Sequence, residues 1–166
     1  MRTNEAISLD DEFVDLEEGI IEIHQTKFGK SRKIPFHAST KEILKEYVRT
    51  RDLHYPSRNN SAFFVNSHGC RIDRTAVQRT FRKMCINGDV GTIKGLNPRI
   101  MDLRHTFAVR NLLKCFKEDL DVDQVIIALS TYLGHENPEC TYGYLTSTPE
   151  LLSLINLRVE KKYWRK

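Results

Sequence analysis

The chain has 166 residues, 40% apolar and 29% charged, which is ordinary for one globular domain and too short for two of typical size. No stretch approaches the run of about 18 apolar residues that a membrane span requires, and the N-terminus lacks the apolar segment of a signal peptide. We therefore expect a cytoplasmic protein without a membrane partner. The four cysteines show neither zinc-site spacing nor a disulfide framework, which predicts reduced thiols.

Charge is distributed unevenly along the chain. The net charge is +4, acidic residues crowd the segment 10–18, and basic residues recur at 27–33, 71–83, 94–110 and 158–166. Clusters of this kind occur on solvated faces and also on surfaces that bind polyanions such as DNA. The net charge agrees with nucleic-acid binding but is too small to establish it.

The first 36 residues predict a short helix and a small sheet. Residues 2–9 have the spacing of the end of a helix. The β-branched runs at 19–25 and 31–36, joined by a basic turn that contains a glycine, predict a hairpin. A preceding strand at 13–16 would complete three antiparallel strands, about the minimum for a persistent sheet.

The rest of the chain is expected to be helical. Apolar residues at helical spacing predict a helix over 40–54, capped by Ser39 or Thr40. Asp73 is expected to cap a basic helix whose apolar side carries Val77, Phe81 and Met84. Further helices are expected at 102–116, 122–133, 138–144 and 149–157. The predicted fold class is α+β, mostly helical with one small three-stranded antiparallel sheet.

Two segments stand out in the second half. Residues 101–108 are Met-Asp-Leu-Arg-His-Thr-Phe-Ala and residues 132–138 are Tyr-Leu-Gly-His-Glu-Asn-Pro, with Tyr144 nine residues after His135. These segments resemble the catalytic domain of the tyrosine recombinase (phage integrase) family. That family has a Leu-Arg-His-Thr-Phe-Ala-like box and a Leu-Gly-His box followed nine residues later by the nucleophilic tyrosine. Both boxes occur here in that order.

The resemblance reaches the N-terminus. Arg2, followed three residues later by Glu5, looks like the family's first arginine box. The family places a lysine at the tip of a β-hairpin, and Lys27 takes that position, with Lys30 in the same turn as the alternative. The match covers nearly the whole chain, and its specificity comes from four boxes in order. It implies a fold of the DNA breaking-rejoining enzyme type.

The resemblance implies a role for each matching residue. Arg2 and Arg104 would clamp the charged oxygens of a DNA phosphodiester, because two planar guanidinium groups can make paired hydrogen bonds to them. His135 would donate a further hydrogen bond, and Lys27 would protonate the leaving 5′ oxygen. Tyr144 would attack phosphorus and form a covalent 3′-phosphotyrosine. Cationic side chains supply the charge, so no metal or other cofactor is expected.

Three residues are expected to support this site. Glu5 would orient Arg2, because residues three apart share one face of a helix. His105 is expected to be structural and bonded inside the fold. The family usually has a polar residue three positions before its second arginine, and here Met101 precedes Arg104. A methionine cannot donate a hydrogen bond to phosphate, and the loss of one such donor costs about a hundredfold or more in rate.

The first hypothesis is therefore a site-specific recombinase or integrase, with residues 1–166 as a single catalytic domain and 157–166 as a basic tail. The resemblance implies an upstream DNA-binding domain, a double-stranded DNA substrate and a synaptic homotetramer on DNA. The second hypothesis is a non-catalytic DNA-binding module or integrase remnant. A type IB topoisomerase uses the same chemistry, but the short interval from His135 to Tyr144 favours a recombinase. Tyr142 is the alternative nucleophile.

Overall fold

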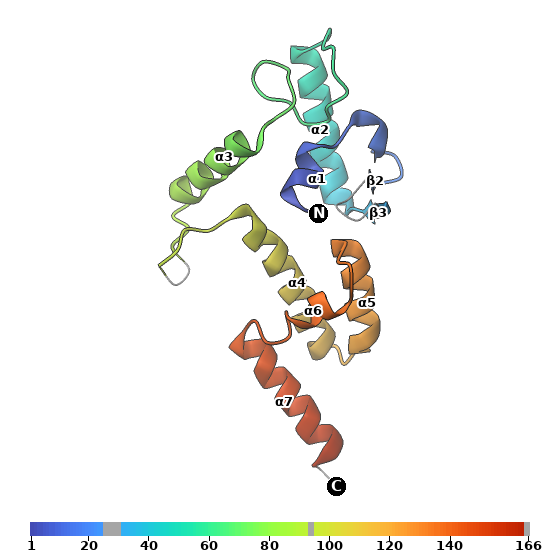
Figure 1. The fold of residues 1–166 in the computed structure, drawn as a ribbon, viewed down its shortest axis with the longest axis vertical. Helices are drawn as coiled ribbons and strands as arrows, with labels where there is room; N and C mark the ends of the chain where they lie inside the picture. The colour runs from blue at the N-terminus through green and yellow to red at the C-terminus, as the bar shows by residue number, and fades with distance from the viewer. Residues whose placement is uncertain (25–30, 93–94, 165–166) are drawn as a thin grey trace. The chain divides into compact units, whose positions relative to one another are not determined.

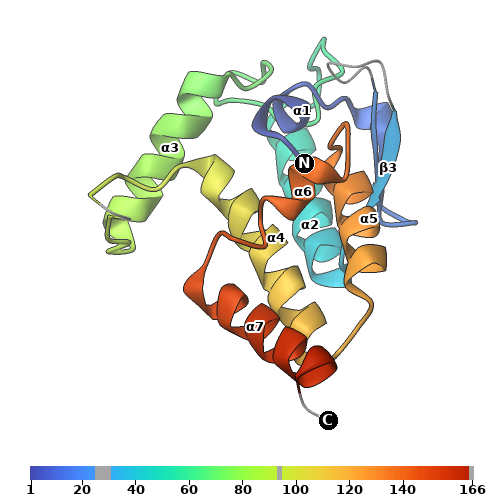
Figure 2. The same cartoon turned by 60° about the horizontal axis from the view of Figure 1, so that its bottom comes forward.

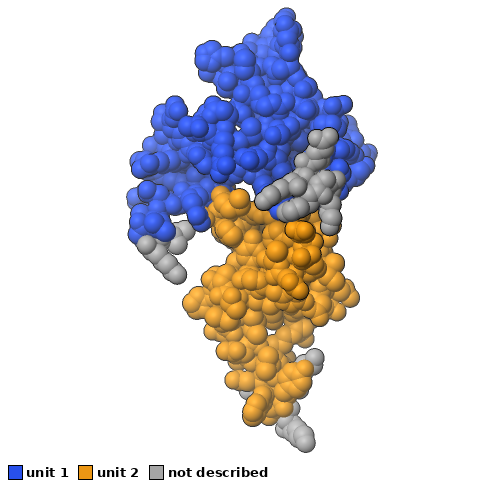
Figure 3. Space-filling model, in the orientation of Figure 1, with its two compact units in different colours: residues 1–100 blue, residues 101–166 orange. Residues whose placement is uncertain are grey.

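The computed structural model describes residues 1–24, 31–92 and 95–164. Within these ranges it contains seven α-helices, one short 3₁₀ helix and three strands (Figure 1). The three strands form one antiparallel sheet, so the predicted α+β class is confirmed. The elements fall into two compact units, residues 1–100 and residues 101–166 (Figure 3).

The sheet of the first unit follows a short N-terminal helix. In chain order these elements are α1 (Thr3–Ile7), the 3₁₀ helix η1 (Asp11–Phe13), β1 (Val14–Asp15), β2 (Ile20–Ile23) and β3 (Arg32–Pro35). The strand order is β1-β2-β3, and Ile21 of β2 pairs with Val14 on one side and Ile34 on the other. Because successive side chains of a strand point to opposite faces, Ile21 and Ile23 are both buried. The first strand is shorter than predicted, because Phe13 ends the 3₁₀ turn.

Two longer helices complete the first unit, α2 (Ala38–His54) and α3 (Arg74–Asn87). The predicted cap of α2 was wrong: the ring nitrogen Nδ1 of His37 accepts a hydrogen bond from the Ser39 amide at 3.2 Å. The predicted cap of α3 is confirmed, since the Asp73 carboxylate accepts a hydrogen bond from the Ala76 amide at 2.9 Å.

The predicted apolar face of α3 is only partly correct. Met84 was expected on it but is 65% exposed. The buried residue of this helix is its neighbour Cys85. Adjacent residues lie about 100° apart around the axis of a helix. The buried face of α3 is therefore rotated toward Cys85 and away from Met84, relative to the predicted face.

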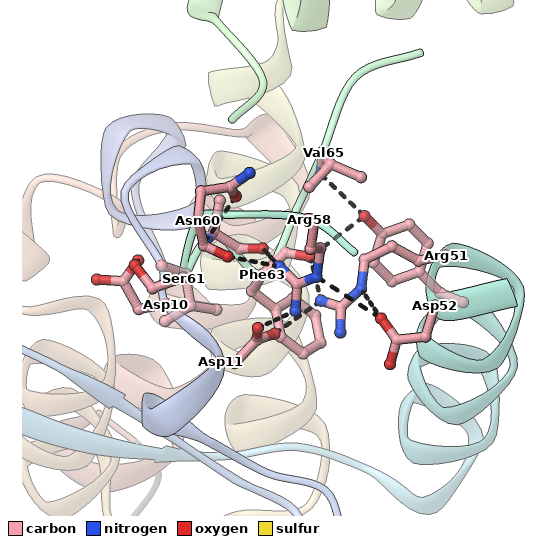
Figure 4. A network of polar contacts seen from close by, with 12 residues as sticks. Asp10, Asp11, Arg51, Asp52, Arg58, Asn60, Ser61, Phe63 and Val65 are labelled. Atoms are coloured by element: carbon pink, nitrogen blue, oxygen red, sulfur yellow. Dashed lines mark hydrogen bonds and ion pairs between the residues drawn. The ribbon is translucent and has the colours of Figure 1, made fainter. Parts of the chain in front are cut away.

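A network of polar contacts fastens the N-terminal segment to α2 (Figure 4). Arg51 of α2 is buried, and its Nη1 atom donates to the Asp11 carboxylate and to the Phe63 carbonyl, both at 2.7 Å. Its Nε atom donates to Asp52 at 2.8 Å. Arg58 also bonds the Asp11 carboxylate. A buried charge is stable only when it is paired and hydrogen-bonded, and these contacts meet that condition for Arg51.

The second unit consists of four helices, which can be followed in Figure 2: α4 (Ile100–Lys117, whose first residue lies in the first unit), α5 (Val122–Leu133), α6 (Glu139–Tyr142) and α7 (Pro149–Tyr163). The bounds of α5 are those predicted, and the Asp121 carboxylate caps it by accepting from the amides of Asp123 and Gln124. The buried core of the unit is contributed by α4, α5, α7 and the segment after α6: Ala108, Leu112, Ile126, Leu129, Leu133, Tyr144 and Leu151.

Helix α7 extends beyond the predicted end at Leu157 and includes most of the segment expected to be a basic tail. The Arg158 guanidinium donates to the Leu120 carbonyl at 3.0 Å and lies 5.6 Å from the centre of the Phe116 ring. Arg158 is therefore part of the packing of the second unit.

Among the described residues, no helix combines the length and apolar character needed to cross a bilayer, and no group of three or more His, Cys, Asp or Glu side chains could hold a metal ion. The four cysteines are free thiols. Burial raises the pKa of the Cys115 thiol, which makes it a poor nucleophile.

Candidate active site

Helix α4 holds Arg104 on the same face as its buried residues. Ala108, Leu112 and Cys115 are buried at intervals of four and three residues, and Arg104 precedes the first of them by four. The Arg104 side chain is partly buried, and its Nη2 atom donates to the Leu133 carbonyl at 2.7 Å. This carbonyl belongs to the last residue of α5. The Arg104 guanidinium therefore lies at the C-terminal end of α5, where the Leu-Gly-His box begins.

His135 stands directly after that helix end. Gly134 has φ 70° and ψ 45°, a left-handed conformation that is strained for residues with a side chain. The amides of Gly134 and His135 donate to the carbonyls of Thr131 and Ser130, each at 3.0 Å. These bonds close the last turn of α5 and fix the backbone of His135. Its ring nitrogen Nδ1 lies 2.8 Å from the hydroxyl oxygen of Thr141.

Tyr144 lies close to two histidine rings. It is 9% exposed and belongs to the core of the second unit. Its ring centre lies 6.1 Å from that of His135, with 14° between the planes, and 5.5 Å from that of His105, with 59° between the planes. The structure thus brings Arg104, His135 and Tyr144 together within one unit, through direct contacts and through the end of α5.

Arg2, the other arginine predicted for the site, lies in the first unit. Arg2 directly precedes α1, and the Glu5 carboxylate accepts from its amide at 2.6 Å and from its Nη1 atom at 3.1 Å. Arg32 of β3 also donates to this carboxylate, from Nη2 at 2.8 Å and from Nη1 at 3.2 Å. The side chains of Glu5 and Arg32 are about one tenth exposed, at 10% and 9%. The sheet therefore anchors the helix that follows Arg2.

Arg71 holds the C-terminal end of α1. The Nη1 atom of Arg71 donates to the carbonyls of Ile7 at 2.9 Å and Leu9 at 3.1 Å. Ile7 is the last residue of α1, where backbone acceptors have no partner within the helix, and Leu9 follows two residues later. Lys27 and its alternative Lys30 lie outside the described residues, so their expected role stays a prediction.

Comparison with known proteins identifies the family. Residues 1–150 match the Phage integrase family. The chain belongs to the phage integrase family.

Relatives and solved structures agree with this assignment. A protein of Sinorhizobium fredii named as an integrase/recombinase, y4rB, is 35% identical over 98% of this chain and 52% of its own length. Tyrosine recombinase XerC of Thermodesulfovibrio yellowstonii is 31% identical over 87% of this chain and 45% of its own length. The chain spans about half the length of these curated relatives. Among solved structures, the XerA recombinase aligns with a TM-score of 0.75 at 22% identity, covering 99% of this chain and 54% of that one. The fold is that of a tyrosine recombinase catalytic domain.

His105 differs from its expected place. His105 was expected inside the fold, but it lies on the exposed side of α4, where its ring contacts Tyr144.

Met101 is 38% exposed and lies one helical turn before Arg104, at the position where the family usually has a polar residue. Its environment therefore leaves room for another side chain.

The alternative nucleophile, Tyr142, is engaged elsewhere. Its hydroxyl donates to the Asp123 carboxylate of α5 at 2.7 Å. This hydrogen bond raises the pKa of Tyr142, so its more nucleophilic ionised form is harder to reach. The contact favours Tyr144 over Tyr142 as the nucleophile of an integrase-family site.

Sequence reasoning missed two residues that contact candidate residues, Thr141 and Arg32. Thr141 is fully buried against His135, and Arg32 holds Glu5. Arg32 is separated from its partner by 27 positions, so no local spacing could identify it. A threonine three residues before the expected nucleophile was the one available signal for Thr141.

Proposed function

We propose that the chain is the catalytic domain of a site-specific DNA recombinase that cuts and rejoins DNA strands through a covalent bond to Tyr144. The observation that supports this most directly is the grouping of Arg104, His135 and Tyr144 at the end of α5. Relatives named as integrases and tyrosine recombinases agree with it. Residues of both units would form this one catalytic domain.

The proposed reaction transfers a DNA phosphate from the 5′ oxygen of the next nucleotide to the Tyr144 oxygen. A bond forms from the Tyr144 oxygen to phosphorus while the bond from phosphorus to the 5′ oxygen breaks. The tyrosine hydroxyl loses its proton to water, and the leaving 5′ oxygen takes a proton, which we assign to Lys27. The phosphotyrosine conserves the energy of the broken bond, so another 5′ hydroxyl can reverse the reaction and reseal the strand.

The charge that develops on the phosphate oxygens would be stabilised by three side chains. Arg2 and Arg104 would clamp these oxygens and His135 would donate a hydrogen bond. Double-stranded DNA is the proposed substrate, and the proposed active assembly is a tetramer that brings two DNA sites together.

A non-catalytic DNA-binding protein is the second candidate. Met101 favours it, because this side chain supplies no hydrogen bond to a phosphate. The two candidates differ in whether a covalent bond to DNA forms, and that bond survives denaturation.

The experiment uses duplexes that carry a nick close to the cleavage site, so that the released fragment diffuses away and the covalent intermediate accumulates. Genomic fragments that bind the chain in a binding selection supply the duplexes. Reactions are run at low salt, where contacts to phosphate are strongest. We expect a protein–DNA adduct that survives a denaturing gel, persists in Tyr142→Phe and disappears in Tyr144→Phe, with unchanged DNA binding.

Two results would contradict the enzyme hypothesis. Binding without any adduct supports the DNA-binding protein, and an adduct of normal yield in Tyr144→Phe assigns the nucleophile elsewhere. Absence of DNA binding contradicts both candidates.

A further inference from the structure

Thr141 joins the two central residues of the proposed site. Its side chain is fully buried, and its hydroxyl oxygen lies 2.8 Å from Nδ1 of His135. Its backbone carbonyl accepts a hydrogen bond from the Tyr144 amide at 3.1 Å, and its own amide donates to Pro138 at 2.7 Å. Thr141 therefore contacts the histidine through its side chain and the tyrosine through its backbone.

The burial of the hydroxyl determines the direction of its hydrogen bond. Buried hydroxyl hydrogens almost always have an acceptor, because leaving one without a partner is costly. Among the described residues, Nδ1 of His135 is the one hydrogen-bond partner of the Thr141 hydroxyl. If Nδ1 carried a proton, the hydroxyl would have to accept and its own hydrogen would have no acceptor. The buried hydroxyl is satisfied when it donates to Nδ1.

This direction fixes the proton of the neutral imidazole ring. A neutral histidine carries one proton, on either Nδ1 or Nε2. A hydrogen bond donated to Nδ1 requires a lone pair there, which puts the proton on Nε2. In that form Nε2 is a hydrogen-bond donor, as a contact to a phosphate oxygen requires. With the proton on Nδ1, Nε2 would present a lone pair to the phosphate and repel it.

We propose that Thr141 is a positioning residue that selects the form of His135 with its proton on Nε2, so that the neutral ring donates to the scissile phosphate. This inference rests on the proposed recombinase function. It explains why a hydroxyl is buried in α6, between the Leu-Gly-His box and the tyrosine. Protonation of His135 is not required for its role.

The test compares Thr141→Val with Thr141→Ser. Valine has nearly the shape of threonine but no hydroxyl, whereas serine keeps the hydroxyl and loses a methyl group. The proton position is measured from the ¹⁵N chemical shifts of the His135 ring at alkaline pH, where the ring is neutral, and the signals are assigned with His135→Gln. We expect the proton on Nε2 in the wild type and in Thr141→Ser, and a shift toward Nδ1 in Thr141→Val.

A kinetic measurement connects the ring to the reaction. The single-turnover rate of adduct formation is measured with saturating protein, so that DNA affinity does not limit it. We expect Thr141→Val to lower this rate by about ten- to a hundredfold, less than or equal to the loss in His135→Ala. Thr141→Ser should stay within a few-fold of the wild type. Thr141→Val added to His135→Ala should cause no further loss.

A proton on Nδ1 in the wild type overturns the proposal without reference to any variant. An unchanged proton position in Thr141→Val overturns it as well, even if cleavage slows, since the effect is then one of packing. If Thr141→Val does not fold, the wild-type and Thr141→Ser spectra decide. The spectra do not depend on cleavage, so they separate failure of this inference from failure of the recombinase function.

Discussion

The carboxylate of Glu5 is expected to stabilise the fold around Arg2 strongly. It accepts hydrogen bonds from the Arg2 amide and Nη1 atom and from the Nη1 and Nη2 atoms of Arg32, at distances from 2.6 to 3.2 Å. Glu5→Gln removes the negative charge and replaces one acceptor oxygen with an amide group that faces donors. Hydrogen bonds to charged groups contribute about 1.5–3 kcal/mol each, and the glutamine oxygen keeps some of them in weaker form.

We therefore expect Glu5→Gln to lower the free energy of unfolding at neutral pH by about 2–4 kcal/mol. For a chain of this length the melting temperature should fall by about 5–15 °C. Circular dichroism during thermal and urea denaturation measures both quantities. The rate of adduct formation should fall as well, because the same carboxylate orients Arg2.

The effect should depend on pH in a defined direction. Burial raises the pKa of the Glu5 carboxyl, but the hydrogen bonds from Arg32 and Arg2 outweigh burial and leave the pKa below its ordinary value of 4.5. A carboxyl with a lower pKa in the folded state stabilises the fold above its ordinary pKa and loses this effect as the pH falls through the folded pKa. The stability difference between wild type and Glu5→Gln should therefore shrink in acid.

The matched control is Glu17→Gln. Glu17 also forms an ion pair, with Lys45 at 2.7 Å, but its side chain is 78% exposed. Exposed ion pairs contribute little, so its unfolding curve should match that of the wild type. Equal stability of Glu5→Gln and the wild type at neutral pH, or a difference that does not shrink in acid, would refute the reasoning.

Two further predictions concern the reaction with DNA. Met101→His should raise the single-turnover rate of adduct formation, because it adds a hydrogen-bond donor one helical turn before Arg104, at a partly exposed position. An unchanged rate in a folded variant would favour the hypothesis of a non-catalytic DNA-binding protein. Arg79 and Lys83 are exposed one helical turn apart on the basic helix α3, and we expect them to contact DNA phosphates. Arg79→Ala and Lys83→Ala should each weaken DNA binding and reduce its salt dependence by about one unit of slope, whereas Arg49→Ala on α2, which removes an arginine paired with Glu46, should not. Equal effects at all three sites would refute contact between α3 and DNA.

Elements with strong local signals were predicted well. Helix α5 begins and ends where predicted, because Asp121 caps its start and Gly134 ends it in a left-handed conformation. The cap of α2 was missed because histidine is rarely a cap, and the contact depends on the ring of His37 accepting from Ser39. Helix α7 was predicted too short because the charged residues after Leu157 resemble a solvated tail, although Arg158 packs on the second unit.

The candidate site was likewise predicted only in part. Family motifs indicated Arg104, His135 and Tyr144 without any knowledge of the fold. The residue that holds the partner of Arg2 could not be found this way, because Arg32 reaches Glu5 only after the sheet has formed. Likewise, the direction of the Thr141 hydrogen bond follows from burial, which is a property of the folded chain.

The contact between Arg104 and the Leu133 carbonyl has a consequence for the entropy of binding. A long side chain on the surface samples many rotamers and loses that freedom when it grips a ligand. Arg104 has already lost much of it during folding, because the end of α5 fixes one edge of its planar group. In the proposed reaction, the other donors of its guanidinium would then meet the phosphate in a restricted orientation. A lysine at this position would keep the charge but not the planar fork, so it would have to be ordered anew at each binding event.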